Sequence, residues 1–305
     1  MTVATESNGL ISQERNILGD PLQQIEAMQH EIHLLRAELD AQHRRDRIAQ
    51  FQMDRIDEEM RLAAKLQHDF LPKTLPQIGQ VRFHALYRPA GYVSGDLYDV
   101  MRLDEQHVGF YMADAVGHGV PAALLTMYLK RALITKHITP DGYRLLRPGE
   151  AMARLNEALL EQNLSQATFA TALYGIVNVN TLGIRFARGG HPTPILIKRD
   201  GQLEMLECDG SLLGIFDDEK FQDRQVGLQP GDRLLVFSDG IEVAFSTEEG
   251  FDGDKWLQDL TERNHLSAEE LIRDLATRLD TESGSLEPKD DLTIIAMEAI
   301  EPSDK

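Results

Sequence analysis

The first feature of the chain is a long segment in which apolar residues return every seven positions. Between Leu22 and Leu71 the chain contains neither Pro nor Gly. Two positions of each heptad form a seam, occupied by Leu18, Ile25, Ile32, Leu39, Asp46, Met53 and Met60, and by Met28, Leu35, Gln42, Ala49, Ile56 and Ala63. Such a seam is typical of a coiled coil, and Asp20-Pro21 supplies an N-cap and a first helical residue. The pattern predicts one helix over residues 20–71.

The seam weakens at its middle, where Gln42 and Asp46 replace apolar side chains. Polar residues in a seam fix the register or mark a section that opens easily. Because the apolar stripe is narrow, we expect a parallel homodimer through residues 20–71; the alternative is a helix that lies along its own domain. Residues 1–19 are polar and show no periodicity, so we expect a flexible lead.

After Leu71-Pro72, short apolar runs separated by glycines replace the heptads. These runs predict strands at Val81–Tyr87, Val108–Met112, Thr168–Val177, Ile184–Ala187, Pro194–Ile197, Arg233–Phe237 and Leu292–Met297. Amphipathic patterns predict helices at Pro121–His137, Pro148–Asn163 and Ala268–Thr281. The strands come in consecutive runs with helices between the runs, which favours antiparallel sheets covered by helices over a Rossmann-type sheet. We therefore predict an α+β layered sandwich over residues 72–300.

Net charge narrows the classes of partner. The 305 residues carry 50 acidic and 31 basic side chains, which leaves a formal charge of −19. Such a chain repels phosphate backbones and anionic lipids, so we expect neither a nucleic acid nor a membrane as partner. Bound cations would still allow it to handle phosphate groups, because they invert the local field.

Cysteine content and hydropathy indicate the compartment. Cys208 is the only cysteine, so the chain forms no internal disulfide. The first residues lack the pattern of a signal peptide, and no apolar run approaches the roughly 20 residues of a membrane span. We expect a cytoplasmic protein.

Four aspartates stand at the ends of apolar runs. Asp114 and Asp239 each follow directly on such a run, Asp96 lies between two strand-like segments, and Asp290 precedes the final strand. Mg²⁺ and Mn²⁺ prefer oxygen ligands, and the sequence offers no Cys/His cluster for a softer metal. Two such ions about 3.5–4 Å apart activate a water and hold a phosphoryl oxygen. The alternative is that the carboxylates only form turns and caps.

Seven segments in order carry a family resemblance: SGDLYD, ADAVGHG, FATALYG, ARGGHPTPIL, GSLLGI, GDRLLVFSDGIEVA and KDDLTII. With the helix end AAKLQHDFLP, they resemble the SpoIIE-type branch of the PPM/PP2C serine/threonine phosphatases, the bacterial stress and sporulation phosphatases, over residues 63–299. The resemblance implies an αββα sandwich of two antiparallel sheets flanked by helices, preceded here by the long coiled-coil helix. It also implies two ions, Mn²⁺ or Mg²⁺, whose bound water attacks phosphoserine or phosphothreonine directly.

The resemblance also assigns metal ligands. Asp114 would bridge both ions, and the backbone carbonyl of Ala115 would bind one of them. Asp239 and Asp290 would bind the first ion, and Asp96 would bind the second.

Other residues of the same motifs would support the ligands. Asp99 and Asp291 would lie behind them, and Gly117 and Gly119 would let the backbone approach an anion closely. His118 would protonate the leaving alkoxide, although its spacing from the bridging aspartate differs from that of the catalytic histidine in eukaryotic relatives. The alternative for His118 is a loop histidine that bonds to the backbone.

Three further segments are expected to carry no chemistry. His191, in a Gly-Gly-His-Pro segment, is expected to orient a tight turn. Cys208 has no activating neighbour in sequence, and residues 91–95 do not match the G-x-S-x-G motif of serine hydrolases.

These observations predict a metal-dependent protein serine/threonine phosphatase that acts on a bacterial regulatory phosphoprotein. In the family that it resembles, the typical substrate is a phosphorylated STAS-domain anti-sigma-factor antagonist. Two alternatives stay open: a non-catalytic coiled-coil scaffold that binds a phosphoprotein, and a metal-dependent phosphohydrolase of a small metabolite. The sequence does not identify an upstream sensor.

Overall fold

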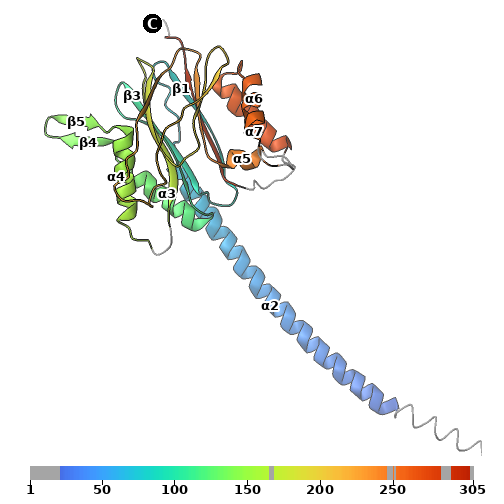
Figure 1. Cartoon of the computed structure of the whole chain (residues 1–305). Helices are drawn as coiled ribbons and strands as arrows, with labels where there is room; N and C mark the ends of the chain where they lie inside the picture. The colour runs from blue at the N-terminus through green and yellow to red at the C-terminus, as the bar shows by residue number, and fades with distance from the viewer. Residues whose placement is uncertain (1–20, 165–167, 246–249, 251, 283–289, 303–305) are drawn as a thin grey trace, which may run out of the picture. The chain divides into compact units, whose positions relative to one another are not determined.

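A computed structural model describes the chain except for residues 1–20, 165–167, 246–249, 251, 283–289 and 303–305, so the predicted flexible lead lies outside the described residues. The chain divides into two compact units, residues 1–59 and 60–305. One helix, α2 (Pro21–Phe70), crosses the boundary and has the length that the heptads predict (Figure 1). None of the described helices is long and apolar enough to cross a membrane.

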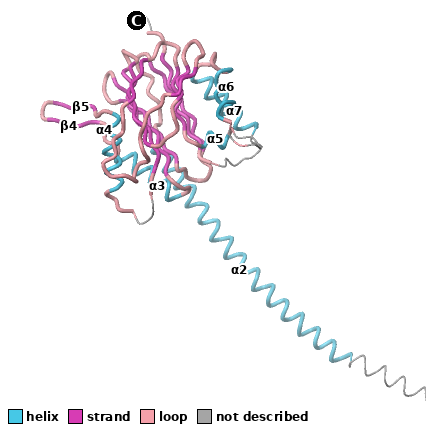
Figure 2. The backbone as a smooth tube through the Cα atoms, in the orientation of Figure 1, coloured by secondary structure: helices cyan, strands magenta, loops and turns pink. Residues whose placement is uncertain are grey.

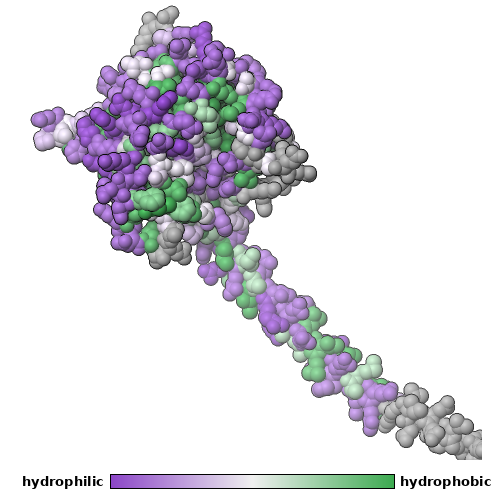
Figure 3. Space-filling model, in the orientation of Figure 1, coloured by the Kyte–Doolittle hydropathy of each residue, from purple (hydrophilic) through white to green (hydrophobic). Residues whose placement is uncertain are grey.

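Most apolar side chains along α2 are exposed. Ile25, Leu39 and Ile56 of the seam each expose about half of their surface, and Figure 3 shows such side chains between polar ones along the helix. The last turns of α2 differ, because Gln67 is buried among residues of the second unit. The compact unit thus begins at Met60, ahead of the predicted boundary at 72.

Two five-stranded antiparallel sheets form the centre of the second unit (Figure 2). The order in the first sheet is β1 (Val81–Arg88), β12 (Leu292–Ala299), β11 (Arg233–Phe237), β8 (Ile195–Ile197) and β9 (Leu203–Met205). The order in the second sheet is β10 (Arg224–Gly227), β7 (Gly183–Gly189), β6 (Ala170–Asn178), β3 (His107–Ala115) and β2 (Asp96–Arg102). All seven predicted strands are present, and among the described strands the order contains no parallel βαβ unit.

Helices cover the outer face of each sheet, which completes the predicted αββα sandwich (Figure 1). The second sheet packs against α3 (Val120–Ala132) and α4 (Pro148–Leu160). The first sheet packs against α5 (Gly240–Ala244), α6 (Gly253–Glu262) and α7 (Ala268–Glu282), with Trp256 and Leu260 of α6 buried in the same apolar cluster as the strands. The sandwich fold class is therefore confirmed.

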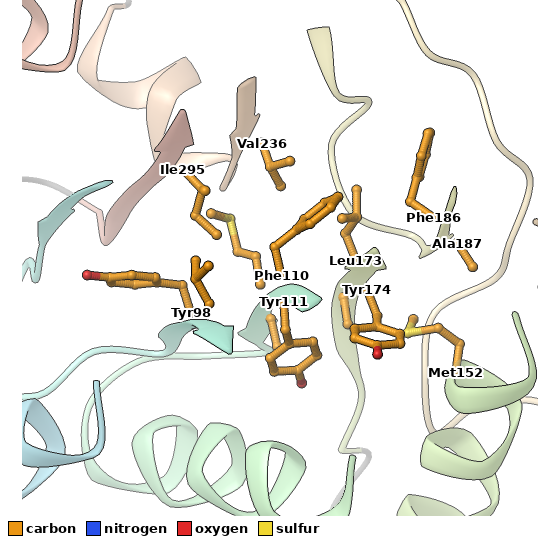
Figure 4. Packing of buried hydrophobic residues seen from close by; sticks show 14 of the residues in the cluster. Tyr98, Phe110, Tyr111, Met152, Leu173, Tyr174, Phe186, Ala187, Val236 and Ile295 are labelled. Atoms are coloured by element: carbon orange, nitrogen blue, oxygen red, sulfur yellow. The ribbon is translucent and has the colours of Figure 1, made fainter. Parts of the chain in front are cut away.

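Alternation along the strands divides the core into layers. Phe110 of β3 faces Val236 and Ile295 of the first sheet, whereas the next residue, Tyr111, points toward the helices α3 and α4 (Figure 4). Successive side chains of a strand project to opposite faces, which produces this arrangement. Gly175 lies opposite Phe110 in the neighbouring strand. Only glycine fits at this position, because a Cβ there would come within 2.1 Å of the phenyl ring.

The sequence pattern missed several short elements. It did not predict β2, β9, β10, α5 or α6, or the hairpin of β4 (Lys136–Thr139) and β5 (Gly142–Leu145). The predicted helix Pro121–His137 is too long, because α3 ends at Ala132 and Leu133 is extended. The β-branched residues that follow favour a strand over a helix, and Pro140 then allows the turn of the hairpin.

Candidate metal centre

Asp96 and Asp114 lie directly opposite each other on the neighbouring strands β2 and β3. Opposite residues of an antiparallel pair project to the same face of the sheet. The side chain of Asp96 is 1% exposed, and its Oδ2 accepts a hydrogen bond of 2.7 Å from the hydroxyl of Thr293. Because Thr293 belongs to β12, both carboxylates lie on the face that meets the other sheet.

Asp239 and Asp290 reach the same end of the sandwich from the first sheet. Asp239 follows β11 after one residue, and Asp290 precedes β12 by two. These strands are antiparallel, and Phe237 pairs with Ile294, so the end of β11 adjoins the beginning of β12. Both side chains are exposed to solvent. The strand ends therefore bring the four predicted aspartates to one region.

Burial and mutual repulsion both act on these carboxylates. Burial raises the pKa of Asp96 well above its ordinary range, and the charge of Asp114 raises it further. Burial also raises the pKa of Asp114, followed by the charges of Asp239, Asp290 and Asp291. The pKa of Asp239 rises through partial burial and then through Asp290. Carboxylates that disfavour one another's charge form a site that favours cations.

The donor set suits a hard divalent cation. In the described part of the chain, no three His, Cys, Asp or Glu side chains are arranged to hold a metal ion by themselves. Mg²⁺, however, keeps several water ligands and binds protein through only one or two carboxylates. The candidate donors are carboxylate oxygens and one backbone carbonyl, which Mg²⁺ and Mn²⁺ prefer. The residues present therefore fit cations that share the strand ends with water.

Backbone atoms also approach this region closely. The amide of Ala115 donates to the carbonyl of Gly95 at 3.0 Å, and a Cβ on Gly95 would lie 3.3 Å from the carbonyl oxygens of Ala115 and Gly117. Gly117 and Gly119 have φ of 88° and 74°, a left-handed conformation that favours glycine. His118 lies between them, and its side chain is exposed. These residues form the loop between β3 and α3.

Asp291 fixes the loop that precedes β2. Its side chain is 8% exposed, and its two carboxylate oxygens accept hydrogen bonds from the amides of Ala90 at 2.7 Å and Gly95 at 2.6 Å. A Cβ on Gly240 would lie only 1.9 Å from the carbonyl oxygen of Asp291, so only glycine fits beside it. Asp291 thus holds the backbone next to Asp96.

Asp99 does not join the cluster. It lies an odd number of residues after Asp96, so it projects from the opposite face of β2. Its Oδ2 is 2.9 Å from Nζ of Lys130 on α3, and Lys130 also donates to the carbonyl of Phe70 at the end of α2. The structure thus pairs Asp99 with a lysine under the helix layer and does not place it behind the ligands, as the resemblance implied.

One residue that contacts the site loop was not predicted. Gln67, 3% exposed, donates to the carbonyl of Ser94 at 2.7 Å and accepts from the amide of Ser94 at 2.9 Å. The hydroxyl of Ser94 in turn accepts from the amide of Asp96 at 3.0 Å. A signal was present, because Gln67 occupies the seam position that follows Met60, where an apolar residue is expected.

The order of the layers, two antiparallel sheets between helices, is that of the PP2C fold. The SiaA-PP2C domain of Pseudomonas aeruginosa has the same fold, with a TM-score of 0.66 and 21% identity over 81% of this chain and 98% of that domain. Residues 104–300 match the family described as Stage II sporulation protein E (SpoIIE). The chain belongs to this family.

Two relatives from Bacillus subtilis (strain 168) support the assignment. The chain is 30% identical over 244 residues to phosphoserine phosphatase RsbU, a match that covers 79% of this chain and 70% of RsbU. It is 31% identical over 186 residues to phosphoserine phosphatase RsbP, which covers 60% of this chain and 45% of RsbP. The match to RsbU is longer than the segment 104–300 that matches the family. The match to RsbP spans less than half of the length of RsbP.

Proposed function

We propose that this protein is a metal-dependent serine/threonine phosphatase that dephosphorylates a regulatory phosphoprotein of a partner-switching system. The observation that carries the proposal is the pairing of Asp96 with Asp114 on one sheet, opposite Asp239 and Asp290 at the strand ends of the other. The repulsion among these carboxylates supports a cation site, and membership of the SpoIIE family supports phosphate as the group handled there.

Each ligand has a proposed role. Asp114 would be shared by two ions of Mn²⁺ or Mg²⁺, because it interacts electrostatically with the carboxylates of both sheets. Asp239 and Asp290 would hold the first ion, and the backbone carbonyl of Ala115 would bind one of the two ions. Asp96 would hold the second ion, and the hydroxyl of Thr293 fixes its carboxylate.

Ions bound there would activate a water as nucleophile and neutralise the charge of the phosphoryl oxygens. The protein supplies the orientation. Gly117 and Gly119 shape the loop that faces the phosphate, and the N-terminus of α3 adds a positive dipole end. His118 protonates the leaving serine oxygen from the same loop, where its side chain is open to solvent.

The proposed substrate is a STAS-domain protein phosphorylated on serine. Two observations support a protein substrate of this kind. RsbU and RsbP are named phosphoserine phosphatases. The region of the aspartates is also open at the surface, with Asp239 and Asp290 exposed, which suits a phosphoserine on a folded partner better than an enclosed metabolite.

Phosphate release from a serine-phosphorylated STAS protein tests the proposal. The wild-type chain should release phosphate in the presence of Mn²⁺, and this release should stop when EDTA is added. The substitution Asp239→Ala should lower kcat about 100-fold or more. Asp200→Ala is the matched control, because Asp200 forms an Asp-Gly turn where β8 leads into β9, beside the beginning of β11 rather than its end. Full turnover in EDTA, or faster turnover of a phosphorylated metabolite, would contradict the proposal.

A further inference from the structure

His191 is a buried polar residue close to the proposed metal centre. Its side chain is fully buried, and Nδ1 lies 2.8 Å from the hydroxyl oxygen of Thr171. The other ring nitrogen, Nε2, has no hydrogen-bond partner among the described residues. The main chain around the ring is fixed, because Arg188 donates to the carbonyl of His191 at 2.6 Å and to that of Cys208 at 2.9 Å. The ring therefore makes one polar side-chain contact, with Thr171.

Thr171 is in turn a neighbour of the proposed bridging ligand. It lies on β6 directly opposite Asp114 on β3, and Asp114 lies opposite Asp96 on β2. Directly opposite side chains share a face and have Cβ atoms about 4.5–5.5 Å apart. The three side chains thus form one row across the second sheet, with Thr171 next to Asp114 in the row.

The direction of the hydrogen bond follows from the unpartnered nitrogen. Burial, and then the charge of Arg188, lower the pKa of His191 to about 3, so the ring is neutral and carries one proton. A proton on Nε2 would leave a buried N–H without an acceptor, which proteins rarely tolerate. A proton on Nδ1 leaves only an unfilled acceptor, at lower cost. The ring therefore donates from Nδ1 to the hydroxyl oxygen of Thr171.

That donation decides where the hydroxyl of Thr171 sends its own hydrogen. Its oxygen already accepts from His191, so the hydrogen is free to reach an acceptor in the row. A carboxylate is the strongest type of acceptor there. The structure already contains one hydroxyl that donates to a carboxylate of this row, because Thr293 of the other sheet donates to Asp96 at 2.7 Å.

We propose that His191 is a positioning residue that orients the hydroxyl of Thr171 toward the carboxylate of Asp114 and so fixes the orientation of the bridging ligand. The contact between His191 and Thr171 is seen in the structure, and the onward bond to Asp114 is the inferred step. The inference rests on the proposed metal-dependent function, because it assigns Asp114 to the cations.

Calorimetric titration of the full chain with Mn²⁺ tests this inference without turnover. His191→Phe keeps the ring size but removes the donor, and it should weaken Mn²⁺ binding about 10- to 100-fold, as is typical when the partner of a metal ligand is lost. His191→Asn places an amide N–H near the position of Nδ1 and should stay close to the wild-type affinity. His191→Gln places its amide near Nε2 and should resemble His191→Phe.

Variants of Thr171 separate positioning from packing. Thr171→Val should weaken Mn²⁺ binding as much as His191→Phe, and Thr171→Ser should not. In the Thr171→Val background, His191→Asn and His191→Phe should bind Mn²⁺ equally, because the bond that distinguishes them is gone. A histidine that only packs would lower the melting temperature and leave these affinities unchanged.

The outcomes are distinguishable. Wild-type affinity in His191→Phe, or additive losses in the double variant, would overturn the positioning role while the metal site stands. If His191→Phe does not fold, the comparison of His191→Asn with His191→Gln decides, and equal affinities there would overturn the role. A wild-type chain that binds no Mn²⁺ would overturn the proposed function and this inference together.

Discussion

Burial gives the aspartates of the site properties that a surface aspartate lacks. Asp96 is almost fully buried against Thr293 of the other sheet, and Asp114 interacts with the charges of Asp239 and Asp290. Each charge is therefore costly until a cation neutralises it. The same feature that favours metal binding should make the metal-free protein less stable.

Asp114→Asn should raise the melting temperature in EDTA by several degrees, because an amide of the same shape removes a charge that burial and three carboxylates disfavour. A gain of about 1–2 kcal/mol corresponds to roughly 2–8 °C for a domain of this size. Differential scanning calorimetry in EDTA measures it, with Asp200→Asn as the control at an exposed turn. A lower melting temperature for Asp114→Asn than for the wild type would contradict this electrostatic account.

His191 should make stability depend on pH. The unfolded histidine takes up a proton below about pH 6.5, whereas the folded one remains neutral down to a pKa of about 3. Unfolding therefore binds a proton in this window, and stability falls as the pH falls through it. When the pH falls from 6.5 to 5, the free energy of unfolding of the wild type should decrease by about 2 kcal/mol more than that of His191→Asn, as measured by urea unfolding. Equal losses would show that His191 is protonated in the folded state.

The sequence pointed to the four aspartates because each lies next to an apolar or strand-like run, and the structure brings them to one end of the sandwich. The sequence did not predict that Thr171 lies opposite Asp114 or that Thr293 donates to Asp96, because both follow from strand register. Register depends on which strands pair and with what offset. An apolar run in the sequence indicates neither the partner strand nor the offset. The pairing of Asp99 with Lys130 could not be predicted for a related reason: Asp99 projects from the opposite face of β2 to Asp96, and the pattern did not predict β2.

At the scale of elements, long periodic segments were predicted well and short ones poorly. The predicted end of α2 and the predicted bounds of the seven strands agree with the structure to within a few residues. β2 was missed because it is buried on both faces and carries Asp96 and Asp99, so it shows no alternation of apolar and polar residues. β10 and the β4–β5 hairpin were missed because their exposed residues resemble loops.

The end of α2 acts as part of the phosphatase domain. A fragment of residues 72–305 lacks Gln67, with its two bonds to Ser94, and Leu71 of the core. Its free energy of unfolding should be about 2–4 kcal/mol lower than that of a fragment of residues 60–305. Urea unfolding of the two fragments measures the difference. Equal free energies would show that the last turns of α2 contribute nothing to the domain.

In the whole molecule, no other described segment of the chain buries the apolar seam of α2. Ile25, Leu39 and Ile56 remain about half exposed, and such a stripe is buried by a second helix in coiled coils. The full chain should therefore be a parallel dimer at micromolar concentration, and a fragment of residues 60–305 should be a monomer. Light scattering after gel filtration measures both masses, and a monomeric full chain would contradict the homodimer.

We propose that the strand-end aspartates bind the cations on which phosphatase activity depends. The most direct test is the number of Mn²⁺ ions bound per chain, measured by calorimetry alongside phosphate release from the same sample. We expect two ions in the wild type, fewer in Asp239→Ala, and activity that rises only as the sites fill. A wild-type chain that hydrolyses phosphoserine at its full rate with no Mn²⁺ or Mg²⁺ bound would contradict it.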